Sequence, residues 1–268
     1  MLTLDWKDRL VRDSIDYFER KLPEGDYDFD IIYNAYPERN DNKIPRDVIV
    51  LVANTLAMKM LKHHSQYIPF CDYIWKHKGL NGKVAFACIV SKFLRKDYQF
   101  YFDYSKKHLS KTKDNIEINM LLDKIFYPLF KKQPMNNIDT IINWIKEDNE
   151  KVNQQLIKIV FKISKTEPEF LVKFINRLEH KWLDANPEFA KICGFFLKLL
   201  AKHDYDLYVN MYKNYKTSRE PIFVEILTFG LVKYDDAIYE IYENWGKSGN
   251  ARLKKSAVTG LKFLSKRK

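Results

Sequence analysis

A single apolar pattern recurs six times along this chain of 268 residues. Within each copy the apolar residues are spaced as i, i+3, i+4, i+7 and i+8, which places them on one face of a helix. The copies start at Val84, Ile118, Val152, Phe189, Phe223 and Leu253. The intervals between these starts are 34, 34, 37, 34 and 30 residues. A period of about 30 to 47 residues is typical of solenoids that are built from paired helices.

A partner helix is predicted before each striped helix, so the repeating unit is a pair of helices. The predicted first helices lie near residues 66–78, 97–109, 136–147, 168–182, 204–216 and 235–247. An aromatic residue recurs near the end of five of them, as Trp75, Trp144, Trp182, Tyr215 and Trp245. Large aromatic side chains at repeat interfaces supply buried area, so we interpret these residues as packing residues rather than ligand-binding residues.

Composition supports a helical class. Apolar residues make up 46% of the chain, which is enough for a continuous core, and 8 Gly and 9 Pro are too few for the turns of a β-sandwich or barrel. We therefore predict an all-α fold. Paired helices at this period resemble HEAT repeats, so the expected architecture is a HEAT-like α-α superhelix that forms a curved solenoid of about six to seven helix pairs. The prediction is one domain over residues 1–268, with atypical capping helices in 1–65 and six helix-pair repeats in 66–268.

Three further predictions concern the ends of helices and the N-terminal region. Helices are expected near residues 5–22, 29–36 and 47–61, with a loop at 37–45 between the last two. Asn186 before Pro187 is typical of a helix N-cap. Asp114 and Glu117 have the spacing of a capping box, with Asp in place of Ser or Thr.

The net charge favours a polyanionic partner. The chain carries 46 basic and 35 acidic residues, a formal net charge of +11. Such an excess favours nucleic acid first and an anionic membrane second, while solvated lysine-rich helix faces are the alternative explanation. The three cysteines have no C-x-x-C spacing, and Cys88 and Cys193 fall on apolar stripes. They indicate small core residues in a reducing compartment, so we expect a cytoplasmic monomer without a membrane span.

Lysines concentrate on the face opposite the apolar stripe. At about 100° per residue, positions +2, +6, +9 and +13 from a stripe start point away from the core. In the copies that start at 118, 152, 189 and 253 no acidic residue occupies these positions. The lysines at these positions include Lys124, Lys131, Lys158, Lys165, Lys191, Lys202, Lys255, Lys262 and Lys266. Stacked repeats would join them into a basic groove that suits a phosphate backbone.

Aromatic residues alternate with these lysines, and one copy lacks them. Tyr127, Phe161 and Phe195 lie among the lysines, where they are candidates to stack on exposed bases. The copy that starts at Phe223 has Glu225 and Asp236 at the same positions instead.

Motifs for cofactor, metal or nucleophilic chemistry are not found in the sequence. The six histidines form neither an H-E-x-x-H motif nor a Cys/His cluster, so no metal site is predicted. The glycine patterns of nucleotide-binding loops and the G-x-S-x-G pattern of serine hydrolases are missing as well. We therefore expect no cofactor.

Residues 70–266 resemble the bacterial alkylpurine DNA glycosylases of the AlkD-like DNA alkylation repair family, whose fold is built from HEAT repeats. The resemblance is carried by Ile74-Trp75 followed by Ala85-Phe86-Ala87, and by the segment from Asn143-Trp144 to Asn149 that leads into its striped helix. It implies DNA binding and hydrolysis of the N-glycosidic bond of an alkylated base.

The catalytic positions of that family are substituted in this chain. The resemblance places its Trp-x-x-x-Asp pair at Asn115 and Asn119 and its Arg at Gln154. An Asn cannot supply the carboxylate that would stabilise a cationic sugar or guide a water molecule. Asp114 and Glu117 are the nearby carboxylates, and are the catalytic candidates if the protein is an enzyme.

Two functional hypotheses of different classes follow. The first is a DNA-binding HEAT-like protein, related to alkylation repair, that holds double-stranded DNA through its lysine-rich face. The second is a non-catalytic scaffold that binds an acidic protein in the same groove. RNA is a third candidate ligand.

Overall fold

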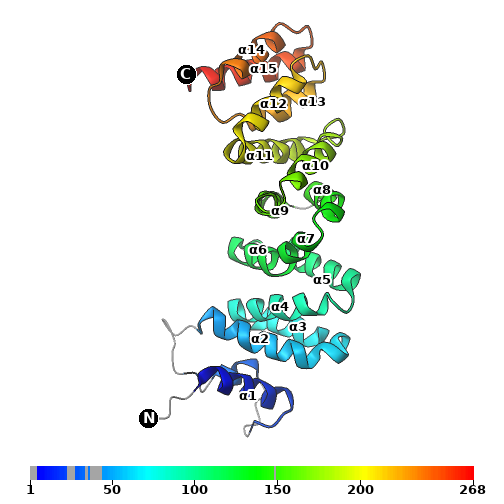
Figure 1. Cartoon of the computed structure of the whole chain (residues 1–268), viewed down its shortest axis with the longest axis vertical. Coiled ribbons are helices and arrows are strands. Elements are labelled where there is room, and N and C mark those ends of the chain that lie inside the picture. Colours follow the sequence, from blue (N-terminus) through cyan, green and yellow to red (C-terminus); the bar gives the residue numbers. More distant parts are fainter. Residues whose placement is uncertain (1–4, 23–27, 34–35, 37–43, 148) are drawn as a thin grey trace. The chain divides into compact units, whose positions relative to one another are not determined.

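The computed structural model describes residues 5–22, 28–33, 36, 44–147 and 149–268. All regular structure in these residues is helical, and no strand occurs among them, so the predicted all-α class is confirmed (Figure 1). No described helix combines the length and the apolar character needed to cross a membrane. Most of the loop predicted at 37–45, and Asp148, lie outside the described residues.

The chain divides into two compact units, Met1–Leu129 and Phe130–Lys268. Helices of the N-terminal unit are α1 (Trp6–Phe18), η1 (Phe29–Tyr33), α2 (Arg46–Met60), η2 (Leu61–Tyr67), α3 (Ile68–His77), α4 (Gly79–Phe93), α5 (Tyr98–Lys111), α6 (Asn115–Leu121) and η3 (Leu122–Phe126). Helix α7 (Tyr127–Lys132) continues from η3 and contains the boundary between the units.

Helices of the C-terminal unit are η4 (Met135–Asn137), α8 (Ile138–Glu147), α9 (Glu150–Ser164), α10 (Pro168–Glu179), α11 (Pro187–His203), α12 (Tyr205–Tyr215), α13 (Pro221–Gly230), α14 (Asp236–Gly246) and α15 (Ala251–Ser265). Each of the six striped segments therefore lies in a helix, and each predicted partner helix is present.

Striped helices pack on one another in chain order within each unit. Helix α2 contacts α4 and α4 contacts α6, while in the C-terminal unit α9 contacts α11, α11 contacts α13 and α13 contacts α15. First helices also meet, as α8 with α10 and α12 with α14. The apolar stripe of each striped helix is thus buried against its neighbours, as the sequence period predicts.

Asparagine or aspartate side chains cap the N-termini of the helices that the site uses. The Asn149 side chain accepts from the Val152 amide at 3.1 Å at the start of α9, and Asn186 accepts from the Phe189 amide at 2.7 Å at the start of α11. These bonds satisfy amides that have no partner within the helix, which fixes where each helix begins. The predicted cap at Asn186 is confirmed.

The helix that starts at Asn115 contains one π-helical turn, η3, that the sequence period does not predict. In it the Tyr127 amide donates to the Leu122 carbonyl, five residues earlier. Pro128 explains the turn, because its ring would clash with the carbonyl of Lys124 in a straight α-helix. The extra residue rotates the remainder of the helix by about 100°. Phe130 is fully buried as a result, whereas Leu129, at the position where the 3,4 spacing from Ile118 would continue, is half-buried.

The predicted stripe of the fifth copy is too long, because α13 ends at Gly230. The Tyr212 hydroxyl donates to the Leu227 carbonyl at 2.9 Å, and the Tyr208 hydroxyl lies 3.3 Å from the Gly230 carbonyl. Two tyrosine hydroxyl groups of α12 therefore satisfy carbonyls in the last turn of α13 that lack a partner within the helix. The sequence pattern placed Asp236 on this helix, but Asp236 is the first residue of α14.

The recurring tryptophans are packing residues, as predicted. Trp144, Trp182 and Trp245 are almost fully buried, and the half-buried Trp75 packs on Phe86 with ring centroids 4.9 Å apart. Burial of such rings contributes about 1.5 to 3 kcal/mol each. They therefore stabilise the scaffold that positions the lysines.

Candidate functional site

Lysines gather at the C-terminal halves of α9 and α11, around a shallow hollow of about 250 Å³. We call this surface the lysine hollow. It is lined by Lys158, Phe161, Lys162, Lys165, Leu199, Lys202 and His203. No acidic side chain is part of the lining. Three of the lysines predicted to bind DNA are thus brought to one place.

The α-helical period explains why the lysines converge. Lys158, Lys162 and Lys165 are spaced as i, i+4 and i+7, so they share one face of α9. Lys202 approaches from the last turn of α11, which packs beside α9. Cations near a helix C-terminus also interact favourably with the helix dipole, so this end of both helices accommodates the charge.

Three of the four lysines in the hollow offer their ammonium groups to a ligand. Lys158, Lys165 and Lys202 are exposed, and none of the ion pairs found among the described residues involves them. Mutual repulsion between like charges is unfavourable, and an anion bound among them would remove it. The hollow is therefore suited to a group with several negative charges.

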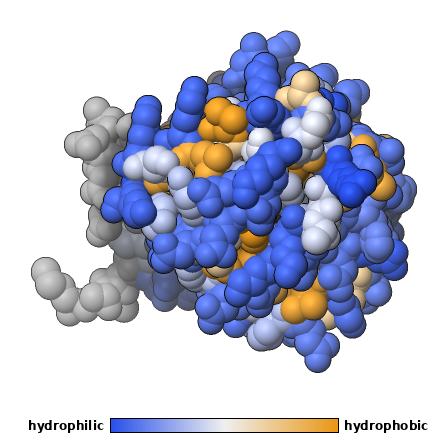
Figure 2. Space-filling model, turned by 90° about the horizontal axis from the view of Figure 1, so that it is seen from above, coloured by the Kyte–Doolittle hydropathy of each residue, from blue (hydrophilic) through white to orange (hydrophobic). Residues whose placement is uncertain are grey.

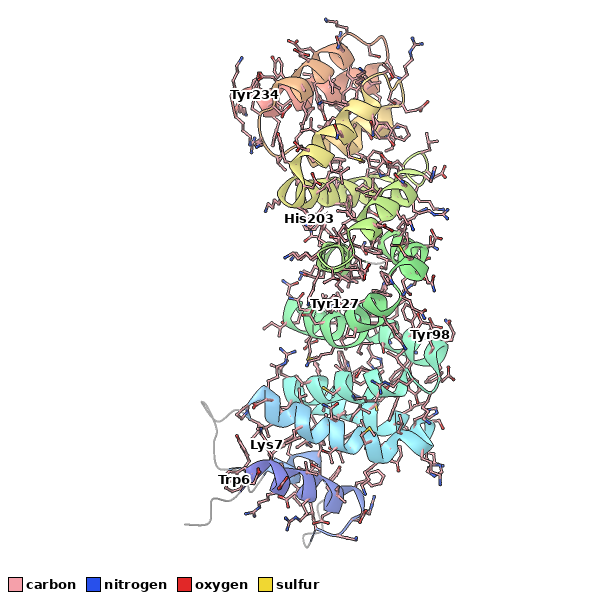
Figure 3. All side chains as sticks on the ribbon, in the orientation of Figure 1. Trp6, Lys7, Tyr98, Tyr127, His203 and Tyr234 are labelled. Carbon is pink, nitrogen blue, oxygen red and sulfur yellow. The ribbon has the colours of Figure 1, made fainter. Side chains whose placement is uncertain are left out.

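His203 closes the hollow at the end of α11, next to α9 (Figure 3). Its Nε2 atom lies 3.3 Å from the hydroxyl of the buried Ser164, which itself donates to the Phe161 carbonyl at 3.0 Å. With that hydroxyl proton committed to the carbonyl, Nε2 serves as the donor to Ser164 Oγ. The imidazole is thereby held in place by α9.

Phe161 does not have the role that the sequence suggested. Its side chain is only 8% exposed, and its ring stacks on Phe196 with centroids 5.1 Å apart. The His203 ring covers it from another side at 5.5 Å. A ring held in this way supports the floor of the hollow and is not placed to stack on a base. Tyr127 and Phe195 are half-buried.

The other predicted lysines lie outside the hollow. Lys131 is exposed on α7, Lys191 is exposed near the start of α11, and Lys124 is half-buried in the N-terminal unit. Lys255, Lys262 and Lys266 are exposed on or just after α15. The end of the C-terminal unit where α14 and α15 lie is mostly hydrophilic, with small separate apolar patches (Figure 2).

The acidic residue that interrupts the lysine pattern is neutralised. Glu225 of α13 accepts two hydrogen bonds from the Arg252 guanidinium, at 2.7 and 2.8 Å. A bidentate pair of this kind is stronger than a single bond and fixes both side chains. α13 therefore presents a closed ion pair rather than an unpaired carboxylate beside α15.

The two catalytic candidates have structural roles. Asp114 caps α6, because its carboxylate accepts from the amides of Ile116 at 2.7 Å and Glu117 at 3.1 Å. Only the Asp114 half of the predicted capping box forms. The Glu117 carboxylate pairs with Lys83 instead of the Asp114 amide. Their catalytic role remains a prediction of the resemblance.

Residues at the family's catalytic positions are polar and uncharged here. Asn115 and Asn119 are exposed on α6, and Gln154 is half-buried on α9. The Gln154 amide donates to Glu150 at 2.9 Å, an i, i+4 contact within the helix. None of the three supplies a carboxylate or a guanidinium.

All three cysteines are buried, so they are core residues as predicted for Cys88 and Cys193. Burial raises the pKa of the Cys71 thiol to about 12, and burial also raises the pKa of Cys88 and Cys193. The thiolate form is the nucleophile, so these thiols are unreactive at neutral pH.

Sequence reasoning missed two polar residues of the hollow, Lys162 and His203, as well as the apolar Leu199. Each polar residue comes directly after a position that the period marks as outward, Phe161 and Lys202 respectively. A wider helical face would have included both, because Lys162 lies one turn beyond Lys158. The contact between His203 and Ser164 of the preceding repeat has no sequence signal.

Comparison of the chain with protein-family models, with curated proteins and with solved structures found no match.

Proposed function

We propose that this chain is a HEAT-like repeat protein that binds duplex DNA through the phosphate backbone, with the lysine hollow as a principal contact. The observation that carries the proposal is the set of four lysines and one histidine around a single hollow that no acidic residue lines. The exposed lysines of α15 and the net charge of +11 extend the favourable field.

The shape of the hollow favours phosphate over an acidic helix. An amphipathic helix docks by inserting apolar anchors at i, i+3 or i+4, i+7 spacing into a hydrophobic groove. The apolar residues of the hollow are Leu199, which is half-buried, and Phe161, which is buried. A shallow hollow with a rim of lysines instead matches an anion that stays solvated on one side.

The test is salt-dependent binding of a labelled duplex, measured by fluorescence anisotropy. The variant Lys158→Gln/Lys165→Gln/Lys202→Gln removes three charges and keeps three long side chains. If each lysine contacts one phosphate, the slope of log affinity against log salt falls by about 0.9 per lysine, or about 2.7 in all.

A matched control removes three charges elsewhere in the same unit. Lys173, Lys213 and Lys247 are exposed and lie on or at the end of the first helices α10, α12 and α14. The control variant Lys173→Gln/Lys213→Gln/Lys247→Gln has the same net charge as the first variant. Equal slopes for the two variants, or binding that does not respond to salt, would contradict the proposal.

Two competitors distinguish the remaining hypotheses. RNA of equal length that displaces the duplex at lower concentration would assign the hollow to RNA. An acidic protein that binds with the hollow intact, while duplex DNA fails to compete, would assign it to a protein partner.

Base excision is the further activity that the resemblance implies. It is tested by release of free base from an alkylated duplex, before and after the change Asp114→Asn/Glu117→Gln. Release that survives this double change would reject both carboxylates as catalytic residues.

A further inference from the structure

A second cavity lies on the same pair of helices as the lysine hollow. Its volume is about 460 Å³. We call it the amide cavity, and it is lined by Ile145, Lys146, Asn149, Glu150, Asn153, Asn186, Glu188, Phe189, Lys191 and Ile192. The N-terminal ends of α9 and α11 form this cavity, and the C-terminal halves of the same helices form the hollow. One site therefore lies toward the N-terminal ends of this pair of helices and the other toward their C-terminal ends.

The chemistry of the amide cavity differs from that of the hollow. Two ammonium groups, two carboxylates and three side-chain amides line it, so its charges balance. Buried faces of Ile145, Phe189 and Ile192 supply an apolar wall, and Lys146 Nζ lies 5.7 Å from the centroid of the Phe189 ring. Donors and acceptors around an apolar wall suit a neutral ligand that carries both kinds of group on one edge.

From this contrast we propose that the amide cavity binds an unstacked nucleobase of a strand whose phosphates lie in the lysine hollow. The inference rests on the proposed function of the hollow. A nucleotide combines an anionic phosphate with a neutral base that carries donors and acceptors, and the two sites on α9 and α11 show the same division. Amide NH2 groups donate to acceptors on a base edge, and Glu accepts from the cytosine amino group.

Distance along α9 is compatible with one strand reaching both sites. Asn153 and Lys158 are five residues apart, a rise of about 7.5 Å in an α-helix. This is about the axial length of two nucleotides in one strand of B-DNA, at 3.4 Å each. A base in a fully paired duplex cannot enter the cavity, so the ligand is a single strand or a base turned out of the stack.

The experiment compares single strands that have the same number of phosphates. One probe carries bases throughout, and the other is abasic. We expect the wild-type protein to bind the base-bearing strand at least about fivefold more tightly. That ratio should fall toward one in Glu150→Leu/Glu188→Leu, which removes both acceptors, and in Asn186→Ser, whose hydroxyl can still cap α11.

Matched variants separate the cavity from general electrostatics. Removing two carboxylates strengthens binding of any polyanion, so the control Glu167→Gln/Glu169→Gln carries the same charge change on exposed residues at the start of α10. The control should keep the ratio between the strands. The hollow variant Lys158→Gln/Lys165→Gln/Lys202→Gln should weaken both strands and also keep the ratio.

Free nucleosides test the cavity without any phosphate. Adenosine or cytidine should shift the side-chain amide signals of Asn149, Asn153 and Asn186 in nuclear magnetic resonance spectra. Equal affinity for the two strands, a ratio that the cavity variants leave unchanged, or shifts caused by glycine rather than by nucleosides would overturn the inference. If neither strand binds while nucleosides still shift the signals, the function proposed for the hollow fails and the cavity's ligand class stands.

Discussion

Gly194 lies where α11 crosses α13, and its replacement by Ala is expected to destabilise the C-terminal unit. A Cβ atom at Gly194 would lie 2.3 Å from Phe229 Cβ and 2.8 Å from the Phe229 carbonyl carbon. Carbon atoms are at their best separation at about 3.5 to 4.0 Å, so the two helices would have to part by about 1 Å. The backbone of α13 cannot yield easily, because Tyr212 holds the Leu227 carbonyl.

Overpacking of this kind costs about 1 to 3 kcal/mol, and contact with backbone argues for the upper end. The higher helix propensity of Ala than of Gly offsets about 1 kcal/mol of this cost. The free energy of unfolding of Gly194→Ala should therefore fall by about 2 kcal/mol.

Gly246 supplies the matched control, since its added Cβ would meet only Leu261 Cδ1 at an ordinary 3.7 Å. Gly246→Ala should be neutral or more stable than the wild type by up to about 1 kcal/mol. The assay is equilibrium urea unfolding followed by far-ultraviolet circular dichroism. Equal unfolding midpoints for the two variants would refute the argument that α11 and α13 are in backbone contact at Gly194.

Three other outcomes are expected. Tyr212→Phe should lower the free energy of unfolding by about 1 to 3 kcal/mol, because a buried carbonyl of α13 loses its donor; Tyr239→Phe on α14, whose hydroxyl has no hydrogen bond among the described residues, is the control in the same urea assay. Glu225→Gln should strengthen duplex binding more when Arg252 is retained than in an Arg252→Gln background, since the freed guanidinium then faces solvent. Anisotropy on both single variants and the double variant checks this, and additive effects would contradict it. Fully paired duplexes of different sequence should bind with equal affinity, because phosphate contacts carry no base information and a paired base cannot enter the amide cavity, and a preference in a direct competition would disagree.

The apolar period is sufficient to locate the helices but not all of their ends. Val152 and Phe189 begin buried stripes in α9 and α11 as predicted, because local spacing decides which face of a helix is apolar. The end of α13 depends on hydroxyl groups of α12, which no local pattern encodes. Pro128 is a visible signal for a distortion before it, although whether the helix kinks, ends or widens depends on packing.

The sequence predicts that the candidate site consists of lysines, but it predicts only some of their positions. The period identifies Lys158, Lys165 and Lys202 as outward residues, and α9 and α11 do bring them together. It cannot show that α15 presents its lysines outside this hollow, because that depends on how each helix rotates against the next. The sequence does not predict the amide cavity. It identifies two of the cavity's asparagines, Asn149 and Asn186, only as residues at the starts of helices.

The π-helical turn before Pro128 bears on where the chain can be divided. The boundary between the two compact units, at Leu129 and Phe130, falls inside α7 and directly after that turn. A fragment that began at Phe130 would start within a helix and expose unsatisfied amides next to a buried ring. A fragment that began at Asp114 would retain its own N-cap. A break in the segment before α6 therefore leaves whole helices on both sides, whereas a break at the boundary between the compact units, some fifteen residues later, cuts α7.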